Sequence, residues 1–230
     1  MKIHGLQKLT LLDFPGRTAC TVFLGGCDFA CPFCHNAEII DGSAEAIMDD
    51  TELLAFLEKR KGLLDGVAIT GGEPTLRKDL PILLESIKSL GYKTKLDSNG
   101  NNPEMLKTLL DSKLVDYIAM DVKNSREKYA LTCGKDYIDM AGIEKSIDLI
   151  KTYADDYEFR TTVIEQLHDE ESFFGIGELI NGAKKYFLQA FTDRDSVVFA
   201  GFSAPDKEKM LKYADIMQNY TDSVQLRGID

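Results

Sequence analysis

Residues 21–34 read TVFLGGCDFACPFC, a short apolar run that leads through two glycines into three cysteines. The run is rich in β-branched and aromatic residues, which is typical of a buried strand. Cys27, Cys31 and Cys34 then fall within eight positions. Closely spaced thiols can staple a fold, hold zinc or bind an iron–sulfur cluster, and the rest of the chain decides between these.

The composition is that of one globular domain. At 230 residues, with 44% hydrophobic and 28% charged residues, the chain is long enough to bury a sizeable core. No repeat or linker-like tract divides it, so we expect a single domain over residues 1–230. The formal net charge of −11 argues against a nucleic-acid binder, because phosphate contacts need clustered Lys and Arg.

Cysteine usage and the N-terminal residues indicate a reducing compartment. Residues 1–17, MKIHGLQKLTLLDFPGR, contain no apolar run of signal-peptide length, and no segment reaches the ~20 apolar residues of a membrane span. Five cysteines, three of them in one loop, do not suit a secreted disulfide framework. The sequence therefore predicts a cytoplasmic protein without a membrane partner, whose clustered thiols hold metal.

Short β-rich runs alternate with amphipathic helical patterns along the chain, which favours a parallel sheet covered by helices. Asp50 and Thr51 suit a helix N-cap before one such pattern. The predicted strands are 18–24, 67–70, 94–97, 117–121, 158–163, 186–190 and a short 223–227. The predicted helices are 50–61, 78–90, 103–112, 140–153, 170–183 and 206–218.

About six βα units in this order predict an α/β fold with a partial, incomplete TIM-like barrel. The alternative is an open, doubly wound sheet. In both topologies the carboxyl ends of the parallel strands meet at one edge, where ligands bind. Residues of a ligand site should therefore follow the carboxyl ends of the predicted strands.

The unusual residues do follow strand ends. The cysteines come directly after the first predicted strand, TGGEP (70–74) after the second and DSNG (97–100) after the third. MDVKN (120–124) ends the fourth strand, Arg160 lies in the fifth and Gln189 ends the sixth. Because they share one end of the sheet, these clusters are expected to face a single cleft.

The spacing of the thiols favours a cluster over zinc. A structural zinc site takes four ligands in two pairs, whereas this chain offers three cysteines separated by three and then two residues. Cys20 lies inside the first strand and Cys133 has no neighbouring thiol, so both are expected to be small buried residues. Three thiolates on a [4Fe–4S] cube would leave one iron open for another ligand.

With these residues in view, the chain resembles the radical S-adenosylmethionine (SAM) superfamily. Cys27, Cys31 and Cys34 match the cluster ligands of that superfamily, and Phe33 matches an aromatic residue whose backbone contacts the adenine. The resemblance implies a barrel of the radical SAM type, a [4Fe–4S] cluster and SAM as cofactors.

The TGGEP segment strengthens this resemblance. In the superfamily a Gly-Gly-Glu segment binds the methionine end of SAM, and Gly71, Gly72 and Glu73 match it. Glycines let the backbone approach a ligand closely, and an ammonium group needs carbonyl or carboxylate acceptors. Taken alone, the segment could equally be a strand-to-helix turn in which Pro74 begins the next element.

A narrower resemblance covers nearly the whole chain. GLQKLTLLDFPGR (5–17), CPFCHN (31–36), DSNG, MDVK and VQLRG (224–228) resemble the glycyl-radical-enzyme activating enzymes, and most of all the activating proteins of anaerobic ribonucleoside-triphosphate reductase. The resemblance implies hydrogen abstraction from a glycine of such a partner, with electrons from a flavodoxin- or ferredoxin-type donor.

The same resemblance assigns further cofactor-binding residues. In the related pyruvate formate-lyase activators an Asp, the hydroxyl residue after it, and an Asp and a backbone carbonyl on the next strand hold a monovalent cation beside SAM. Asp97, Ser98 and Asp121 match the side-chain positions of that site. Positions that contact SAM are matched by Asn99, Lys123 and Arg160. The simpler alternatives are an Asx turn at 97–100, a solvated surface lysine, and a structural bridge from Arg160 to Glu158 or Asp121.

The chain departs from the pyruvate formate-lyase activators at Gln189, where they carry a histidine near SAM. Glutamine forms hydrogen bonds but does not titrate, so its presence weakens that assignment and leaves cation binding open. No further cysteine-rich block exists, so one cluster is the limit. His168 is expected at a helix entry, and the sequence assigns no role to His35.

Three alternatives remain at this stage. The protein could be a radical SAM enzyme on a free metabolite, similar to a carboxy-deazaguanine synthase, or a pyruvate formate-lyase-type activator. It could also be an iron–sulfur electron carrier without enzyme activity, although TGGEP and DSNG on successive strand ends argue for a SAM pocket.

Overall fold

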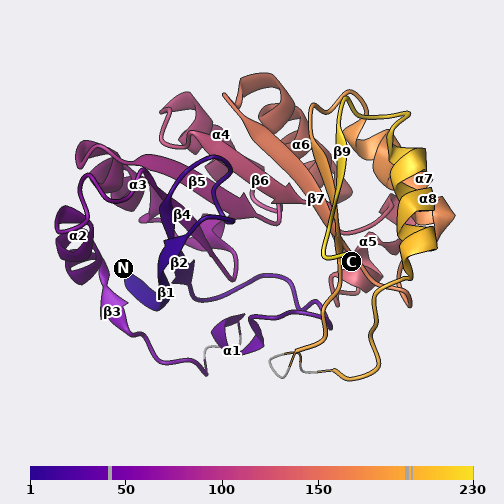
Figure 1. Ribbon diagram of the computed structural model, residues 1–230, viewed down its shortest axis with the longest axis horizontal. Helices are drawn as coiled ribbons and strands as arrows, with labels where there is room; N and C mark the ends of the chain where they lie inside the picture. The colour runs from indigo at the N-terminus through magenta and orange to yellow at the C-terminus, as the bar shows by residue number, and fades with distance from the viewer. Residues whose placement is uncertain (41–42, 195–196, 198, 230) are drawn as a thin grey trace.

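The computed structural model describes residues 1–40, 43–194, 197 and 199–229, and within them one curved sheet organises the chain. The strand order is β3-β1-β2-β4-β5-β6-β7-β8-β9, in which β2 and β4 to β9 run parallel and β1 and β3 are antiparallel additions (Figure 1). The strands are β1 Lys2–Thr10, β2 Ala19–Leu24, β3 Met48–Asp49, β4 Gly66–Gly71, β5 Lys93–Ser98, β6 Tyr117–Asp121, β7 Tyr157–Val163, β8 Tyr186–Ala190 and β9 Val224–Arg227.

Helices follow the parallel strands along the chain. They are α1 Ala37–Ile40, α2 Asp50–Glu58, α3 Leu80–Ser89, α4 Pro103–Asp111, α5 Arg126–Thr132, α6 Met140–Tyr153, α7 Glu170–Ile180 and α8 Lys207–Met217. The pairs α2–α3, α4–α6, α6–α7 and α7–α8 pack on each other in chain order. This succession places the helices around one face of the sheet, as in a barrel, and the doubly wound alternative is wrong.

The barrel is incomplete, as predicted. Six parallel strands, β2 and β4 to β8, are each followed by helical segments, and the edge strands β3 and β9 end the sheet without pairing to each other. Figure 1 shows β9 facing the loop between β1 and β2 across the concave side of the sheet. The sheet is therefore not closed on itself as in a complete barrel.

Each predicted strand and helix is present, with bounds that differ by a few residues. The prediction missed β1, β3, α1 and α5. Strand β1 reads KIHGLQKLT, and only Ile3 and Thr10 of it are buried, because it lies near the edge of the sheet. The prediction missed it because its sequence lacks a regular apolar alternation. The predicted N-cap of α2 is also wrong by one residue.

The N-cap of α2 is Asp49. Its carboxylate accepts a hydrogen bond of 2.9 Å from the backbone N–H of Glu52, whose own carboxylate accepts one of 3.0 Å from the N–H of Asp49. Asp50 instead forms an ion pair of 2.9 Å with the N-terminal amine of Met1. The reciprocal pair of bonds satisfies two of the free donors at the helix start, which is why the helix begins here.

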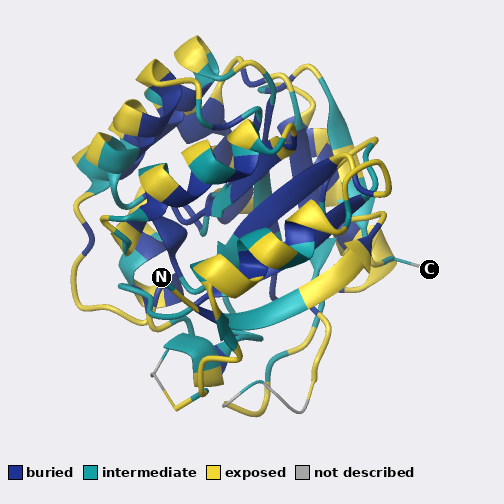
Figure 2. Ribbon diagram, turned by 90° about the vertical axis from the view of Figure 1, so that its left-hand side faces the viewer, coloured by how far each residue is buried: buried dark blue, intermediate teal, exposed yellow. Residues whose placement is uncertain are grey.

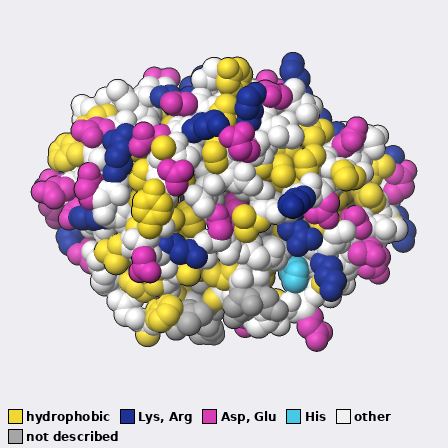
Figure 3. Space-filling model, turned by 180° about the vertical axis from the view of Figure 1, so that it is seen from behind, with side chains coloured by type: hydrophobic (Ala, Val, Ile, Leu, Met, Phe, Trp, Pro, Cys, Tyr) yellow, Lys and Arg dark blue, Asp and Glu magenta, His cyan; other side chains and the backbone are white. Residues whose placement is uncertain are grey.

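The hydrophobic core lies between the helices and the outer face of the sheet. Buried residues such as Leu53, Leu84 and Ile147 on the helices face buried strand residues such as Leu96 and Phe159 (Figure 2). No helix in the described part of the chain is long and apolar enough to span a bilayer. On the face seen from behind, acidic and basic side chains are interspersed (Figure 3).

The concave face of the sheet is different in character. Side chains alternate along a strand, so Leu96 of β5 points to the helices while Lys95 and Asp97 point to the interior. Strand β7 repeats the pattern with Glu158 and Arg160. The interior of the barrel therefore carries charges close to the strand ends at which ligands bind in this fold.

Candidate active site

A cavity at the carboxyl ends of the parallel strands brings the predicted site residues together. It lies among the loops after β2, β4, β5 and β6 and the ends of β7 and β8. Its lining includes Cys27, Cys31, Phe33, Cys34, Gly71, Gly72, Glu73, Asp97, Ser98, Asn99, Asp121, Lys123, Arg160 and Gln189. The convergence follows from topology, since parallel strands place their carboxyl ends at one edge of the sheet.

Glycines allow the cysteine loop to touch the turn after β4. A Cβ atom on Gly72 would lie 2.0 Å from the carbonyl oxygen of Gly26, and one on Gly71 would lie 2.3 Å from that of Leu24. Gly71 also has φ of +121°, a conformation that side chains rarely adopt. The close approach lets the N–H of Glu73 donate a hydrogen bond of 2.8 Å to the Gly26 carbonyl. The GGE segment is therefore required for the contact between the two loops.

Backbone N–H groups of the loop point at two of the three sulfurs. The N–H of Phe29 donates to Cys27 Sγ at 3.4 Å, and the N–H of Asn36 donates to Cys34 Sγ at the same distance. The Asn36 side chain also donates to the Gly71 carbonyl oxygen at 2.9 Å. Hydrogen bonds of this kind stabilise negative charge on sulfur and tune a bound iron–sulfur cluster.

The protonation of the three thiols differs. Burial raises the pKa of Cys27 to about 12 and also raises that of Cys34. A hydrogen bond with Cys133, which opposes the effect of burial, lowers the pKa of Cys31 to about 7. Cys20 and Cys133 are fully buried, as predicted. The expectation that Cys133 has no neighbouring thiol is wrong, because its side chain forms a hydrogen bond with Cys31. Thiols that are neutral when free release protons when they bind a metal.

The donor set fits an iron–sulfur cluster better than a single metal ion. Among the residues that the structure describes, no three His, Cys, Asp or Glu side chains converge as the ligands of one ion must. A four-iron cube does not require this convergence, because each thiolate binds a different iron. Cys27, Cys31 and Cys34 line one cavity without meeting at a point, and that arrangement suits a cluster.

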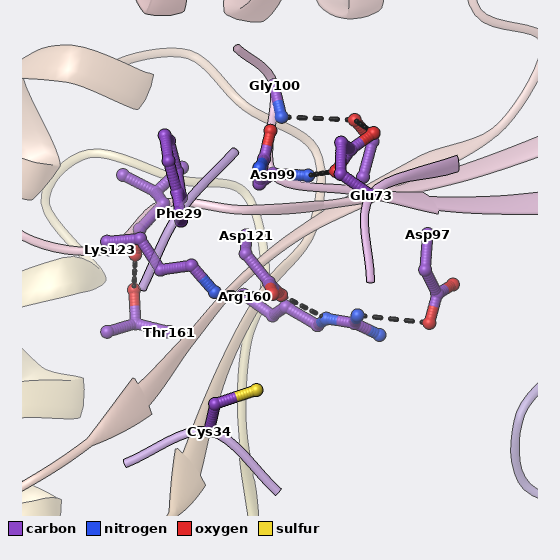
Figure 4. A network of polar contacts seen from close by, with 12 residues as sticks. Phe29, Cys34, Glu73, Asp97, Asn99, Gly100, Asp121, Lys123, Arg160 and Thr161 are labelled. Atoms are coloured by element: carbon purple, nitrogen blue, oxygen red, sulfur yellow. Dashed lines mark hydrogen bonds and ion pairs between the residues drawn. The ribbon is translucent and has the colours of Figure 1, made fainter. Parts of the chain in front are cut away.

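Glu73 joins the turn after β4 to the end of β5. Its Oε1 atom accepts hydrogen bonds from the Thr75 hydroxyl at 2.5 Å, the Thr75 N–H at 3.0 Å and the Ser98 hydroxyl at 2.9 Å. Its Oε2 atom accepts one of 2.6 Å from the N–H of Asn99 (Figure 4). Burial raises the pKa of Glu73 to about 7, although these donors act in the opposite direction. The carboxylate thus shapes the pocket wall.

A row of charges crosses the interior from β5 to β7. Arg160 lies between Asp97, at 3.0 Å from Oδ2, and Asp121, whose Oδ1 pairs with Nε (Figure 4). Lys95 pairs with the other oxygen of Asp97, and Lys123 with that of Asp121 at 2.8 Å. Burial alone would raise the pKa of both carboxyl groups, but these cations hold it below its usual range.

Two of these findings concern the predicted alternatives. Arg160 does form a bridge to Asp121, but its second partner is Asp97 and not Glu158. Lys123 is mostly buried and paired, so it is not the solvated surface lysine that the sequence allowed. Lys95 was missed altogether, although its position two residues before Asp97 places it on the same face of the strand.

Asp28 was also missed, and it ties the cysteine loop to the loop after β5. It accepts a hydrogen bond of 2.8 Å from the Asn99 side chain and one of 2.6 Å from that of Asn101. Its position between Cys27 and Cys31 in the sequence could have indicated that Asp28 belongs to the site. Asn99 therefore contacts the cysteine loop and, through its backbone, Glu73.

Two of the three histidines, His35 and His168, fix neighbouring segments. His35 lies 2.7 Å from the Thr192 carbonyl oxygen through Nε2, and its ring stacks on Phe191 with centroids 5.5 Å apart. His168 precedes the N-cap of α7, as predicted, and its Nε2 lies 2.9 Å from the Lys123 carbonyl oxygen. Burial lowers the pKa of His168, which favours its neutral form.

Comparison with known proteins gives a consistent result. Residues 21–171 match the model of the Radical SAM superfamily, which is more than half of the chain. A Methanocaldococcus jannaschii protein named "putative glycyl-radical enzyme activating enzyme" is 31% identical over 239 aligned positions, which cover 99% of this chain and 96% of that protein. The pyruvate formate-lyase-activating enzyme of Clostridium pasteurianum is 35% identical over 129 residues, which cover 50% of this chain and 53% of that enzyme.

The solved structures agree on the fold. A radical SAM methyltransferase from Sphaerobacter thermophilus superposes with a TM-score of 0.73, covering 96% of this chain and 69% of that one. At 14% identity the likeness concerns the fold alone.

Proposed function

We propose, given that this chain belongs to the radical SAM superfamily and within it to the glycyl-radical enzyme activating enzymes, that its partner is an anaerobic ribonucleoside-triphosphate reductase. An enzyme of this family is an oxidoreductase that uses a [4Fe–4S] cluster and SAM. When bound and reduced by an external electron donor, such a cluster would supply the one electron for cleavage of SAM to methionine and a 5′-deoxyadenosyl radical, and this radical would take a hydrogen atom from a glycine of the partner.

The proposal assigns the cluster to the thiols of Cys27, Cys31 and Cys34. The observation that carries it is that these three thiols share one cavity with the turns after β4, β5 and β6. Cys27, Cys31 and Cys34 would hold the cluster through three thiolates, and a fourth iron without a protein ligand would be available to SAM. The pocket residues then orient SAM and exclude water, and no side chain has to act as a general acid or base.

The remaining lining residues are assigned to SAM. Gly71 and Gly72 allow close approach of its methionine end to the backbone, and Phe33 lies by the adenine. Lys123 and Arg160 face the cavity with positive charge, which suits the SAM carboxylate. Asn99 and Gln189 supply uncharged polar groups to the wall; the Gln189 side-chain oxygen also accepts a hydrogen bond of 3.3 Å from Arg227.

A second cavity supports a macromolecular substrate. Asp97, Arg160 and Gln189 line both cavities, so the second lies beside the first. Its other walls come from the loop after β1 and the end of β9, namely Leu12, Asp13, Pro15, Arg227 and Gly228. These two segments border the open side of the sheet (Figure 1). An extended peptide that carries the glycine has a lateral route to the site here.

The decisive experiment combines the reconstituted protein, SAM and dithionite with a candidate reductase under anaerobic conditions. We expect a glycyl radical in the electron paramagnetic resonance spectrum of the reductase, and none when Cys34→Ala replaces the wild type. A flavodoxin or ferredoxin should substitute for dithionite. Cleavage of SAM without a radical on the partner contradicts the proposed partner, and the absence of cleavage contradicts the radical SAM activity itself.

A further inference from the structure

The residues expected to hold a monovalent cation beside SAM do not fit one. Both oxygens of Asp97 are paired, one with Lys95 and the other with Arg160 at 3.0 Å. Both oxygens of Asp121 are paired as well, one with Arg160 and the other with Lys123 at 2.8 Å. All four carboxylate oxygens of Asp97 and Asp121 therefore already face positive charges of the protein.

The hydroxyl group of the expected site is also engaged. Ser98 Oγ donates a hydrogen bond of 2.9 Å to Glu73 Oε1 and accepts one of 3.0 Å from the N–H of Gly100. Both contacts tie Ser98 to the turns after β4 and β5. Hard cations bind through several oxygen ligands at once, and here each expected side-chain ligand is held by another protein group.

The charge balance points the same way. Two carboxylates, Asp97 and Asp121, stand among three cations, Lys95, Lys123 and Arg160, so the row carries an excess of one positive charge. The side chain of Lys95 is only 2% exposed and that of Arg160 is 16% exposed. Screening by water is weak at such depths, so an added cation is repelled.

Lys95 is the residue that makes this arrangement unusual. Its ammonium group reaches Asp97 from two residues earlier on the same strand and lies 5.9 Å from the centre of the Tyr117 ring. The hydroxyl of Tyr117 donates a hydrogen bond of 2.8 Å to Glu158, which also pairs with Arg227 at 3.1 Å. Asp97 and the Tyr117 ring therefore hold the Lys95 ammonium group inside the barrel.

We propose that Lys95 and Arg160 form a built-in cation for this site, so that the enzyme binds SAM without Na⁺ or K⁺. In this role Lys95 is a positioning residue: it holds Asp97 and so leaves Arg160 aligned between Asp97 and Asp121. The part of the inference that concerns SAM rests on the proposed function, whereas the part that concerns the cation does not.

The first test is thermal unfolding in NaCl, KCl and choline chloride at equal ionic strength, which keeps screening the same. We expect one melting temperature for the wild type in all three salts. Lys95→Met removes a charge and keeps the length of the side chain, so this variant should melt several degrees higher in NaCl or KCl than in choline chloride. Lys93→Met, on the same strand but exposed, is the matched control and should not respond.

Two outcomes of this test overturn the proposal. A higher melting temperature of the wild type in NaCl or KCl than in choline chloride shows that the unliganded protein binds an alkali cation. A folded Lys95→Met protein with the same melting temperature in all three salts shows that Lys95 does not take the place of a cation. If Lys95→Met does not fold, the response of the wild type decides alone.

The second test measures the dissociation constant of SAM for the cluster-loaded enzyme in the same salts. We expect values within twofold of each other for the wild type, and at least fivefold weaker binding in choline for Lys95→Met. Tenfold weaker binding of SAM by the wild type in choline chloride contradicts the proposal of a built-in cation. Failure of SAM to bind in any salt contradicts the proposed function, and the unfolding test still decides the cation question.

Discussion

The loops and the strands that surround the site are built in different ways. In the loops after β2, β4 and β5, side chains form hydrogen bonds with backbone groups and with polar side chains of these loops. Asn36 binds the Gly71 carbonyl, Glu73 binds the N–H group of Asn99, and Asp28 binds the Asn99 side chain. In strands β5 to β7, side chains bind other side chains through ion pairs, such as Asp97 with Arg160. The loops thus determine the shape of the pocket, and the strands determine its charge.

This division separates two kinds of sensitivity. A pocket wall held by hydrogen bonds to the backbone changes its geometry when one acceptor is lost, because a buried donor is then left unsatisfied. A row of paired charges leaves no charge without a neighbour when one partner is lost, so the main change is in the charge that the row presents to the pocket. Substitutions in the two regions should therefore separate effects on shape from effects on charge.

The largest effect is expected in the cysteine loop. Cys34→Ala should abolish retention of the [4Fe–4S] cluster and SAM cleavage, because it removes one of the three proposed ligands. Cys20→Ala is the matched control. Cys20 is buried in β2, so its loss should cost roughly 1–2 kcal/mol of stability while iron is retained. Iron and sulfide content with the visible absorption spectrum measure the first effect, and urea unfolding measures the second.

Retention of a full cluster by Cys34→Ala would show that another group serves as the third ligand. Loss of the cluster from both variants would show that the effect arises from general unfolding and not from the ligand set.

The second effect concerns Glu73 and its pH dependence. Its pKa is about 7 in the folded protein and ordinarily 4.5, so the folded state holds the proton more tightly. Stability from this group is therefore fully present below about pH 4.5 and is lost as the pH rises through about 7. The shift corresponds to roughly 3 kcal/mol. Glu73→Gln cannot titrate, so its stability should lack this decline.

Urea unfolding of wild type and Glu73→Gln between pH 4.5 and 8 measures the difference. The wild type should have its largest advantage at the acidic end, and the advantage should shrink as the pH rises. Glu52→Gln, which removes a carboxylate from the start of α2, is the control for the loss of a carboxyl group elsewhere in the chain. A constant difference across the range would mean that the hydrogen bonds from Thr75, Ser98 and Asn99 outweigh burial.

The third effect concerns the charged row. Arg160→Met removes the central cation, but Asp97 keeps Lys95 and Asp121 keeps Lys123. The cost should therefore be about 2 kcal/mol, below the 3–5 kcal/mol that follows when a buried charge loses its only partner. Binding of SAM should weaken more than stability falls, because the proposed carboxylate contact is lost. Equilibrium unfolding and SAM affinity measure the two effects.

Arg126→Met is the matched control, since Arg126 pairs with Glu144 on the exposed helices α5 and α6. It should change stability by less than about 0.5 kcal/mol and leave SAM affinity unchanged. A loss of stability at Arg160 without any change in SAM affinity would restrict this arginine to a structural bridge.

The same division explains which parts of the site could be predicted. The cysteine loop, the GGE segment and DSNG are short stretches, so their residues and their position at strand ends are visible in the sequence. Parallel topology then brings them together without further information. The ion pairs join residues such as Asp97 and Arg160, 63 positions apart, and their geometry depends on strand register that the sequence does not display.

The fold was predictable for a related reason. The buried strands and the helices carry strong apolar patterns, and their order determines the incomplete barrel. Strand β1 escaped prediction because most of its residues are exposed or half-buried, and α5 because its seven residues are too few for a periodic pattern. Lys95 escaped because lysine is ordinarily an exposed residue, and only the interior of the barrel buries it.

The smallest effect is expected at Asp28, which links the cysteine loop to the loop after β5. Asp28→Asn replaces one acceptor oxygen by an amide, so either Asn99 or Asn101 loses its partner. The cost should be about 1 kcal/mol of stability. Hydrogen exchange should become faster in residues 27–34 and 99–101 and stay unchanged in the helices, because the link is local.

Asp111→Asn, which alters an exposed ion pair with Lys107 at the end of α4, is the control and should leave the exchange of both loops unchanged. Faster exchange spread over the whole sheet in Asp28→Asn would mean that this carboxylate stabilises the barrel as a whole. That result would contradict the separation of roles between loops and strands, because one contact between loops would then also stabilise the strands.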